Sequence, residues 1–173
     1  MKYRRVWPLI SFVILVGVFI LVIQFFAARH QALSLRQTAM VTRVVDGDTI
    51  RVLINNREDT VRLVGIDAPE TVNPGKFVQC FGREASDKAK EILNGKTIVL
   101  ESDSTQGDRD EYGRLLRYVF LDNLNFNQFM IGEGYAREYT FKSRDYKYKT
   151  EFIQAEVKAK GNKKGLWADN ICD

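Results

Sequence analysis

Two short acidic clusters in the first half of the chain could bind a metal ion. Asp46 and Asp48 are separated by one glycine, and Asp67 and Glu70 by the pair Ala-Pro. Carboxylates without histidine or cysteine suit a hard cation such as Ca²⁺, which takes about six to eight oxygen ligands. Asp and Gly are also common turn residues, so the first cluster alone could be a plain turn. The second cluster favours metal binding, because one acid would suffice for a turn.

Two arginines could contact the phosphate of a nucleic acid. Arg62 lies shortly before the second acidic cluster, and Arg114 follows Tyr112 and a glycine. The planar guanidinium can bind two phosphate oxygens at once, and positive charge on these oxygens is needed as the transition state of phosphodiester cleavage forms. Either arginine alone could equally belong to a surface salt bridge. Together with the acids, they indicate a metal-dependent phosphodiesterase.

Several other catalytic arrangements are excluded by the composition. The only histidine is His30, which lies outside the expected domain. A Ser-His-Asp triad, a Cys-His pair and a histidine-ligated metal therefore cannot be built there. The two cysteines have no other soft ligands nearby and make no zinc site. The base of an enzyme would have to be a carboxylate, a tyrosine, a lysine or a metal-bound water.

The order of the expected elements predicts a mainly β fold with helices (α+β), an OB-type five-stranded barrel with about three helices. Three strands precede a helix, two more strands follow it, and helices end the chain. In such a barrel, the end of the third strand can lie beside the start of the second, which would bring the acidic clusters together. The strands are expected at 40–45, 49–54, 60–66, 97–101 and 115–121, and the helices at 81–93, 125–131 and 148–159.

The N-terminal segment predicts a membrane anchor. Residues 6–28 carry no charge, and about 20 apolar residues span a bilayer. We expect residues 1–28 to form an uncleaved transmembrane signal anchor, 29–37 a linker and 38–170 the folded domain. The short basic N-terminus favours a single-pass protein with its domain outside the cytoplasm. The alternative is secretion after cleavage. In an exported chain Cys80 and Cys172 can form a disulfide.

The net charge of the whole chain, +4, gives no support to nucleic-acid binding. Residues 1–37 contribute +5, residues 38–141 contribute −4 and residues 142–164 contribute +5. The acidic front half of the domain could hold a hard cation. The basic segment 142–164 is expected to be the solvated face of the last helix, and it could also contact a phosphate backbone.

Five motifs, in this order and spacing, resemble the staphylococcal nuclease (thermonuclease) family over about residues 38–168. They are V-V-D-G-D-T, V-R-L-V-G-I-D-A-P-E, C-F-G-R-E-A-S, D-E-Y-G-R-L-L-R-Y-V-F and the late G-L-W. The resemblance implies an OB-fold barrel and a Ca²⁺-dependent endonuclease and exonuclease that cuts DNA and RNA and leaves 3′-phosphate ends.

The resemblance also implies residue roles. Asp48, Asp67 and the backbone carbonyl of Ala68 match the calcium ligands, and Glu70 matches the carboxylate that activates the attacking water. The remaining matches are the phosphate-binding Arg62 and Arg114, the nucleotide-contacting Tyr112 and Tyr139, and Asp46, an acid near the metal that is usually not a ligand. The chain departs from the family where Ala68 replaces threonine and Glu111 replaces lysine, and the second change leaves substrate affinity open.

Two other classes of protein compete with the nuclease. A nucleic-acid-binding module of the same fold would be weakly active or inactive, and we would expect it to lose some of the acids or arginines. A membrane-tethered structural domain would account for the N-terminal segment but not for the acidic and arginine clusters. We expect DNA and RNA as substrates, the membrane as a further contact, no protein partner and a monomer.

Overall fold

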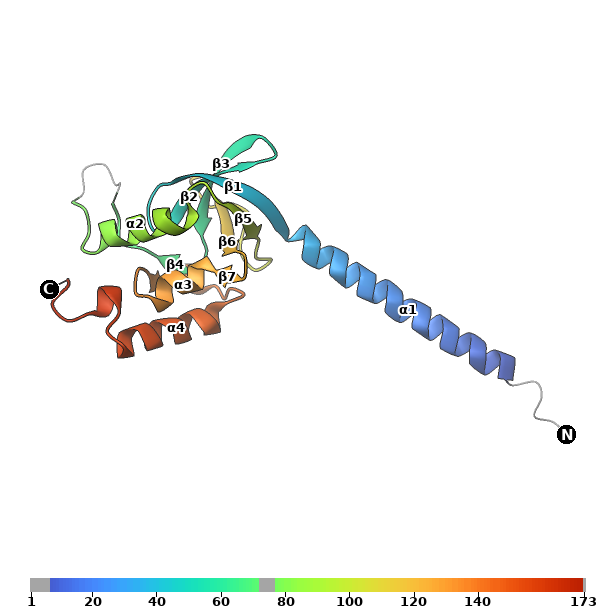
Figure 1. The fold of residues 1–173 in the computed structure, drawn as a ribbon. Coiled ribbons are helices and arrows are strands. Elements are labelled where there is room, and N and C mark those ends of the chain that lie inside the picture. The colour runs from blue at the N-terminus through green and yellow to red at the C-terminus, as the bar shows by residue number, and fades with distance from the viewer. Residues whose placement is uncertain (1–6, 72–76, 173) are drawn as a thin grey trace. The chain divides into compact units, whose positions relative to one another are not determined.

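The computed structural model describes residues 7–71 and 77–172, without the side chains of residues 7–11, 26–34 and 143. The chain divides into two compact units, residues 1–35 and residues 36–173. Figure 1 labels their helices and strands, and each unit is described by itself below.

The first unit consists of helix α1, Trp7–Ser34, and every residue from Phe12 to Phe25 is exposed. Among the described residues, no helix is both long enough and apolar enough to cross a membrane. The transmembrane segment predicted over residues 1–28 is therefore not confirmed. Its first six residues lie outside the described residues.

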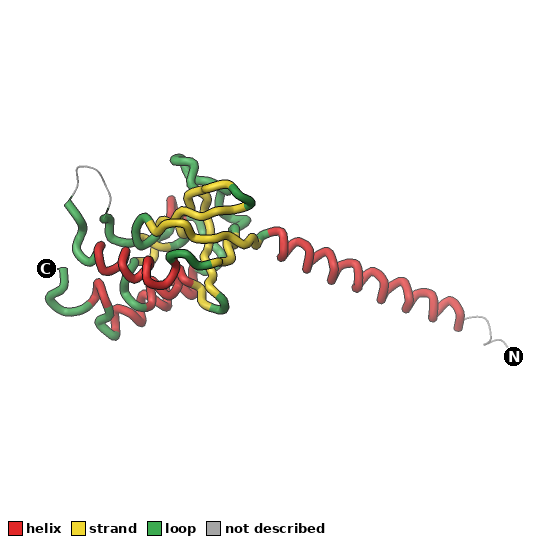
Figure 2. The backbone as a smooth tube through the Cα atoms, turned by 45° about the horizontal axis from the view of Figure 1, so that its top comes forward, coloured by secondary structure: helices red, strands yellow, loops and turns green. Residues whose placement is uncertain are grey.

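The second unit is built on a closed five-stranded barrel. Its strands are β1 Arg36–Val44, β2 Thr49–Ile54, β3 Arg57–Leu63, β5 Thr97–Glu101 and β6 Leu115–Leu121. They pair in the order β3-β2-β1-β5-β6, and a parallel pairing of β3 with β6 closes the barrel. Figure 2 shows these strands side by side in yellow. The predicted five-stranded α+β barrel is thus confirmed.

Alternating apolar side chains fill the barrel. In β2, Ile50 and Val52 are buried while Arg51 between them is exposed. This period of two puts one face of each strand into the core. The other strands contribute further buried side chains to the same core, namely Val41, Val61, Leu63, Ile98, Leu100, Leu115 and Val119.

Three helices decorate the barrel: α2 Gly82–Leu93, α3 Phe126–Gly132 and α4 Lys149–Gly161. Helix α2 buries Ala85, Ala89 and Leu93, which recur every four residues along one face. Helices α3 and α4 pack against each other (Figure 1). All three lie within two residues of their predicted bounds, as expected for helix ends.

Short elements connect these parts. They are the strand pairs β6 with β7 Leu124–Asn125 and β4 Ile66–Asp67 with β8 Arg137–Glu138, and the 3₁₀ turns η1 Phe141–Ser143 and η2 Gly165–Trp167.

Two sequence expectations need correction. The strand predicted over 60–66 is divided at Gly65, whose φ of 78° breaks the extended backbone and separates β3 from β4. The linker predicted over 29–37 is instead the end of α1 and the start of β1. Ala, Gln, Arg and Leu in this stretch favour helix, and residues 36–40 pair with β5.

A disulfide joins Cys80 to Cys172, two residues 92 positions apart. Cys80 lies just before α2, and Cys172 lies near the end of the chain. The covalent bond therefore ties the C-terminal end to the segment that leads into α2.

Candidate active site

The pairing of β3 with β2 and β6 places Arg62 near residues predicted to bind metal and phosphate. In the β2–β3 pairing Arg62 lies opposite Thr49, the residue after Asp48. In the parallel β3–β6 pairing it lies opposite Leu116, two residues after Arg114. Strand β3, which lies between β2 and β6, therefore has the acidic turn before β2 on one side and Arg114, just before β6, on the other.

The Asp-Gly-Asp turn is held tightly against the second acidic cluster. A Cβ on Gly47 would lie 2.6 Å from the Cβ of Ala68 and 3.2 Å from that of Ala85 in α2, so only glycine permits this approach. Asp48 Oδ1 accepts a hydrogen bond from the Thr49 hydroxyl at 2.9 Å. Its Oδ2 accepts one from the amide of Ala68, also at 2.9 Å. The two clusters, 20 residues apart in sequence, therefore share one site.

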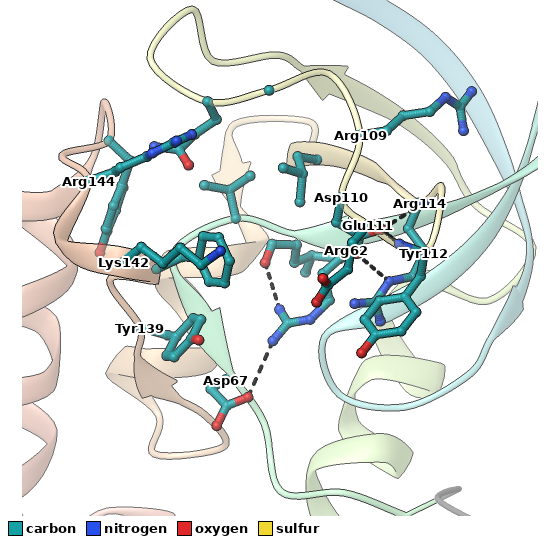
Figure 3. Close-up of a pocket in the computed structure, with 18 residues that line it drawn as sticks. Arg62, Asp67, Arg109, Asp110, Glu111, Tyr112, Arg114, Tyr139, Lys142 and Arg144 are labelled. Carbon is teal, nitrogen blue, oxygen red and sulfur yellow. Dashed lines mark hydrogen bonds and ion pairs between the residues drawn. The ribbon is translucent and has the colours of Figure 1, made fainter.

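The guanidinium of Arg62 bridges the two acidic clusters. Its Nη2 lies 3.1 Å from Asp48 Oδ2 and 3.3 Å from Asp67 Oδ1. Its Nη1 donates to the carbonyl oxygens of Leu63 and Ile66, each at 2.8 Å. These four contacts fix the side chain, which is only 15% exposed, with its charge between two carboxylates. Figure 3 shows the bridge to Asp67.

Two adjoining cavities open at this place, and both are lined by Arg62, Asp67, Tyr112 and Arg114. The first, of about 480 Å³, is lined also by the other acids and their neighbours: Asp46, Asp48, Thr49, Ala68, Glu70 and Gln79. The second, of about 580 Å³, adds aromatic and basic side chains, among them Tyr139, Phe141, Lys142, Arg144 and Tyr146. Figure 3 looks into this second cavity, with Tyr112 and Arg114 on one side of Arg62 and Tyr139, Lys142 and Arg144 on the other.

Negative charge is concentrated in the first cavity. Burial, followed by the charges of Asp48 and Glu70, raises the pKa of Asp46 to about 7. Burial and the charge of Asp48 also raise the pKa of Asp67, although Arg62 opposes this shift. Besides burial, the charges of Asp48 and Glu70 contribute to both pKa shifts, and a bound cation would offset this part of them.

The donor set fits a hard cation such as calcium. Among the described residues, no three His, Cys, Asp or Glu side chains form a metal site by themselves. Asp48 and Asp67, which converge on one cationic group, are thus two carboxylate donors that need carbonyl and water oxygens to complete a shell, and calcium accepts both. Ala68 lines the same cavity, and the role of its carbonyl stays a prediction.

Arg114 and the two tyrosines face the larger cavity. Asp110 Oδ2 accepts a hydrogen bond from Arg114 Nε at 2.6 Å, and the guanidinium carbon lies 5.3 Å from the centre of the Tyr112 ring. Tyr112 is 76% exposed and Tyr139 43%. Both rings are thus open to a flat partner such as a base, and Asp110 fixes the direction of the Arg114 side chain.

Glu70 is positioned through its backbone by Gln79. The amide of Glu70 donates to Gln79 Oε1 at 2.9 Å, and the amide of Gln79 donates to the carbonyl of Glu70 at 3.0 Å. Glu70 Oε1 accepts from the amide of Thr71 at 3.1 Å. These bonds close the two ends of the segment between residues 70 and 79.

All eight predicted site residues line the two cavities: Asp48, Arg62, Asp67, Ala68, Glu70, Tyr112, Arg114 and Tyr139. Neither the positioning of Glu70 by Gln79 nor the orientation of Arg114 by Asp110 was predicted from the sequence. The spacing of Asp110 and Arg114, four residues apart, could have suggested an ion pair. Nothing in the sequence marks Gln79, because eight residues separate it from Glu70.

Carboxylate oxygens and two arginines thus lie together on the wall of a small barrel, an arrangement that suits a hard cation and a phosphate. Comparison with known proteins gives the family. The profile of the family described as "Staphylococcal nuclease homologue" matches residues 60–169, and the chain belongs to this family.

Several bacterial nucleases are similar to this chain. The thermonuclease of Staphylococcus hyicus is 42% identical over 133 residues, which are 77% of this chain and 77% of that protein. The endonuclease YncB of Bacillus subtilis (strain 168) is 41% identical over 127 residues, 73% of this chain and 59% of YncB. The SPbeta prophage-derived endonuclease YokF of the same strain is 43% identical over 129 residues, 74% of this chain but only 43% of YokF.

Proposed function

We propose that this protein is a calcium-dependent nuclease that hydrolyses phosphodiester bonds of DNA and RNA and leaves 3′-phosphate ends. The observation that carries the proposal is the convergence of Asp48 and Asp67 on Arg62, in a cavity that also contains Glu70 and Arg114. Membership of the staphylococcal nuclease homologue family supports the same chemistry, and the similar proteins named above are nucleases.

The side chains of this cavity have distinct roles in the proposed reaction. Asp48, Asp67 and the carbonyl of Ala68 would hold calcium, which supplies Lewis-acid neutralisation of phosphate charge when bound. Glu70 orients or deprotonates the water that attacks phosphorus in line. Arg62 donates hydrogen bonds to an oxygen of the pentacoordinate transition state, and Arg114 to another oxygen or to the leaving group.

The contacts of Arg62 support its proposed role. Nη1 of Arg62 is already held by two carbonyl oxygens, so little side-chain freedom is lost when Nη2 meets phosphate. Donors fixed in advance stabilise developing charge better than mobile ones. Tyr112 and Tyr139 border the larger cavity, where they would pack against the sugar and base of the substrate.

The same geometry disfavours an inactive nucleic-acid-binding module. Such a module needs cations and aromatic surfaces, but it gains nothing from Asp46 and Asp67, whose pKa values are raised by burial and by neighbouring carboxylates. Charge repulsion of this kind is typical of functional sites.

Comparing the protein with its Glu70→Gln variant tests the proposed chemistry. The wild-type chain should digest single-stranded DNA and RNA with Ca²⁺, and a 3′-phosphatase should remove phosphate from the products. The variant should be slower by about 10²–10⁴-fold, the usual contribution of a positioned general base, with an unchanged thermal unfolding midpoint. Equal rates would remove Glu70 from the mechanism, and 5′-phosphate ends would contradict the proposed bond cleavage.

We also propose that residues 1–28 anchor the protein in a cell membrane with the nuclease domain outside the cytoplasm. The charge-free stretch 6–28, which follows Lys2, Arg4 and Arg5, supports an anchor. The disulfide of the domain is typical of an oxidising compartment. Protease added to intact cells should degrade the domain, and alkaline carbonate should leave the chain in the membrane. Protection of the domain until lysis would contradict the orientation. Release by carbonate would favour secretion after cleavage.

A further inference from the structure

A third cavity, of about 530 Å³, lies between the end of β1 and one face of α2. We call it the β1–α2 groove. Its basic lining residues are Arg43, Arg83 and Lys90, and its only acidic one among the described residues is Asp87. None of these residues belongs to the site described above. We propose that the groove binds the phosphate backbone of a single-stranded nucleic acid that extends from the active site, an inference that rests on the proposed nuclease function.

The cations of the groove are incompletely neutralised. Lys90 forms an ion pair with Asp87 at 2.9 Å. Arg43 and Arg83 are exposed, and neither has a side-chain hydrogen bond or ion pair to another described residue. Residues 38–141 together carry a net charge of −4. The two unpaired arginines therefore make the groove a positively charged region within an acidic part of the chain. Such a local positive surface attracts phosphate.

The strand register adds to this positive charge. Arg43 lies opposite Arg51 in the antiparallel pairing of β1 with β2. Like charges directly opposite each other destabilise a sheet. Arg51 has one carboxylate partner, Glu58, at a distance of 3.8 Å. A phosphate bound at Arg43 would offset the repulsion between the two arginines.

A buried hydroxyl in the groove also lacks a partner. Thr71 lines the groove, and its Oγ1 is buried without a hydrogen-bond partner among the described residues. A buried hydroxyl normally finds a partner, because leaving it unpaired costs about 1–3 kcal/mol. A ligand oxygen or a bridging water in the groove could supply one.

The groove and the active-site cavity are lined by neighbouring residues at two places in the chain. Val45 and Thr71 line the groove, while their neighbours Asp46 and Glu70 line the cavity with the carboxylates. Two chain segments thus form a wall shared by both. Helix α2, with its 12 residues, is about 18 Å long at ~1.5 Å per residue, which gives room for several phosphates of one strand.

The chemistry of the groove favours phosphates over bases. Among the described residues, none of its lining side chains is aromatic, so the groove offers no stacking surface of the kind that holds unpaired bases. Contacts from arginine and lysine to phosphate carry no sequence information. The groove would therefore strengthen binding of long substrates of any sequence and leave the cleavage step unchanged.

Binding of labelled oligonucleotides of two lengths tests this inference. The parent is the full-length Glu70→Gln chain in mild detergent with Ca²⁺, which binds without rapid cleavage. A second protein carries Arg43→Gln and Arg83→Gln in addition, and a third carries both changes to lysine. The control carries Arg57→Gln, which removes an exposed cation outside the groove and outside the basic segment 142–164. Fluorescence anisotropy with a trinucleotide and a 12-nucleotide single strand is followed over a range of salt concentrations.

The groove variant should bind the 12-nucleotide strand about tenfold more weakly at low salt. Its plot of log K against log salt should be less steep by about 1.4, at ~0.7 for each lost phosphate contact to a single strand. Trinucleotide binding should stay within about twofold, and the lysine variant and the control should resemble the parent. If the groove variant binds the long strand as the control does, or if the control weakens equally, the inference is wrong and the proposed function stands. If the parent binds neither oligonucleotide, the inference and the proposed function are both wrong.

Discussion

Gln79 and Glu70 hold each other by two hydrogen bonds, one from the amide of Glu70 to Gln79 Oε1 and one from the amide of Gln79 to the carbonyl of Glu70. The next residue, Cys80, is covalently bonded to Cys172. The backbone of the proposed general base is thus fixed by a side chain nine residues later, and that side chain is in turn anchored to the end of the chain.

Replacing Gln79 should impair catalysis without unfolding the protein. In Gln79→Ala the amide of Glu70 loses its partner, and the carboxylate can shift. A misplacement of about 1 Å can lower a rate by up to ~10²-fold, so kcat should fall by about ten- to a hundredfold with little change in KM. Gln154→Ala, an exposed change on α4, is the matched control. Steady-state kinetics showing equal kcat for the two variants would argue against a positioning role.

Removing the disulfide should lower the stability of the domain. The bond closes a loop between residues 92 positions apart, and loss of a native disulfide typically costs about 2–5 kcal/mol. The Cys80→Ser/Cys172→Ser variant should unfold at a lower urea concentration by this free energy. Wild-type protein unfolded without reductant should show no reactive thiol, and two reactive thiols would contradict the pairing.

A buried acid outside the active site should make the fold sensitive to low pH. Glu101 is 1% exposed and accepts hydrogen bonds from Arg36 at 2.5 Å, Lys147 at 2.5 Å and Tyr148 at 2.8 Å. Burial alone would raise the pKa of Glu101, but these three donors outweigh it and the pKa is lowered.

Because the folded pKa lies below the unfolded value of about 4.3, the stabilisation from Glu101 is complete above that value. It is lost as the pH falls through the lower, folded pKa. Glu101→Gln should cost about 1–3 kcal/mol at pH 7, because Arg36 and Lys147 lose a charged acceptor but are themselves half exposed. Its free energy of unfolding should then fall less steeply between pH 5 and 3 than that of the wild type. Parallel curves would contradict this account.

The two arginines of the site should differ in their effect on stability. Arg62→Ala and Arg114→Ala should each lower kcat/KM by about 10²–10³-fold, as lost oxyanion donors do. Only Arg62 also holds two backbone carbonyls and bridges two acids. Its loss should therefore lower the free energy of unfolding as well, by about 1–3 kcal/mol, while Arg114→Ala should unfold nearly as the wild type does. Denaturation curves measured beside the kinetics separate the two effects, and equal destabilisation would contradict the difference.

Much of the domain could be predicted from local patterns. The strands at 49–54, 97–101 and 115–121 agree with β2, β5 and β6, because alternation of apolar residues directly reflects a strand with one buried face. The division of the third strand at Gly65 could not be predicted. It depends on Tyr146 and Phe152, which approach this glycine from distant parts of the chain.

The site residues could be named from the sequence, but their contacts could not. Side-chain types indicated metal and phosphate chemistry, and the family resemblance implied which residues perform it. The bridge of Arg62 between Asp48 and Asp67 depends on the register of β2 and β3. Gln79 orients Glu70, and Asp110 orients Arg114. Both contacts depend on the conformation of loops, which leaves no periodic pattern in the sequence.

The most direct test of the central claim is calcium-dependent cleavage of single-stranded DNA by the full-length chain. The wild type should degrade the strand with Ca²⁺, stop when a chelator is added in excess and resume when Ca²⁺ is restored. Asp67→Asn, which removes one proposed carboxylate ligand, should need a higher Ca²⁺ concentration for half-maximal rate, whereas Asn123→Ala on an exposed turn should need the same concentration as the wild type. Cleavage that continues at full rate in chelator, or an unchanged calcium requirement in Asp67→Asn, would contradict a calcium-dependent nuclease at this site.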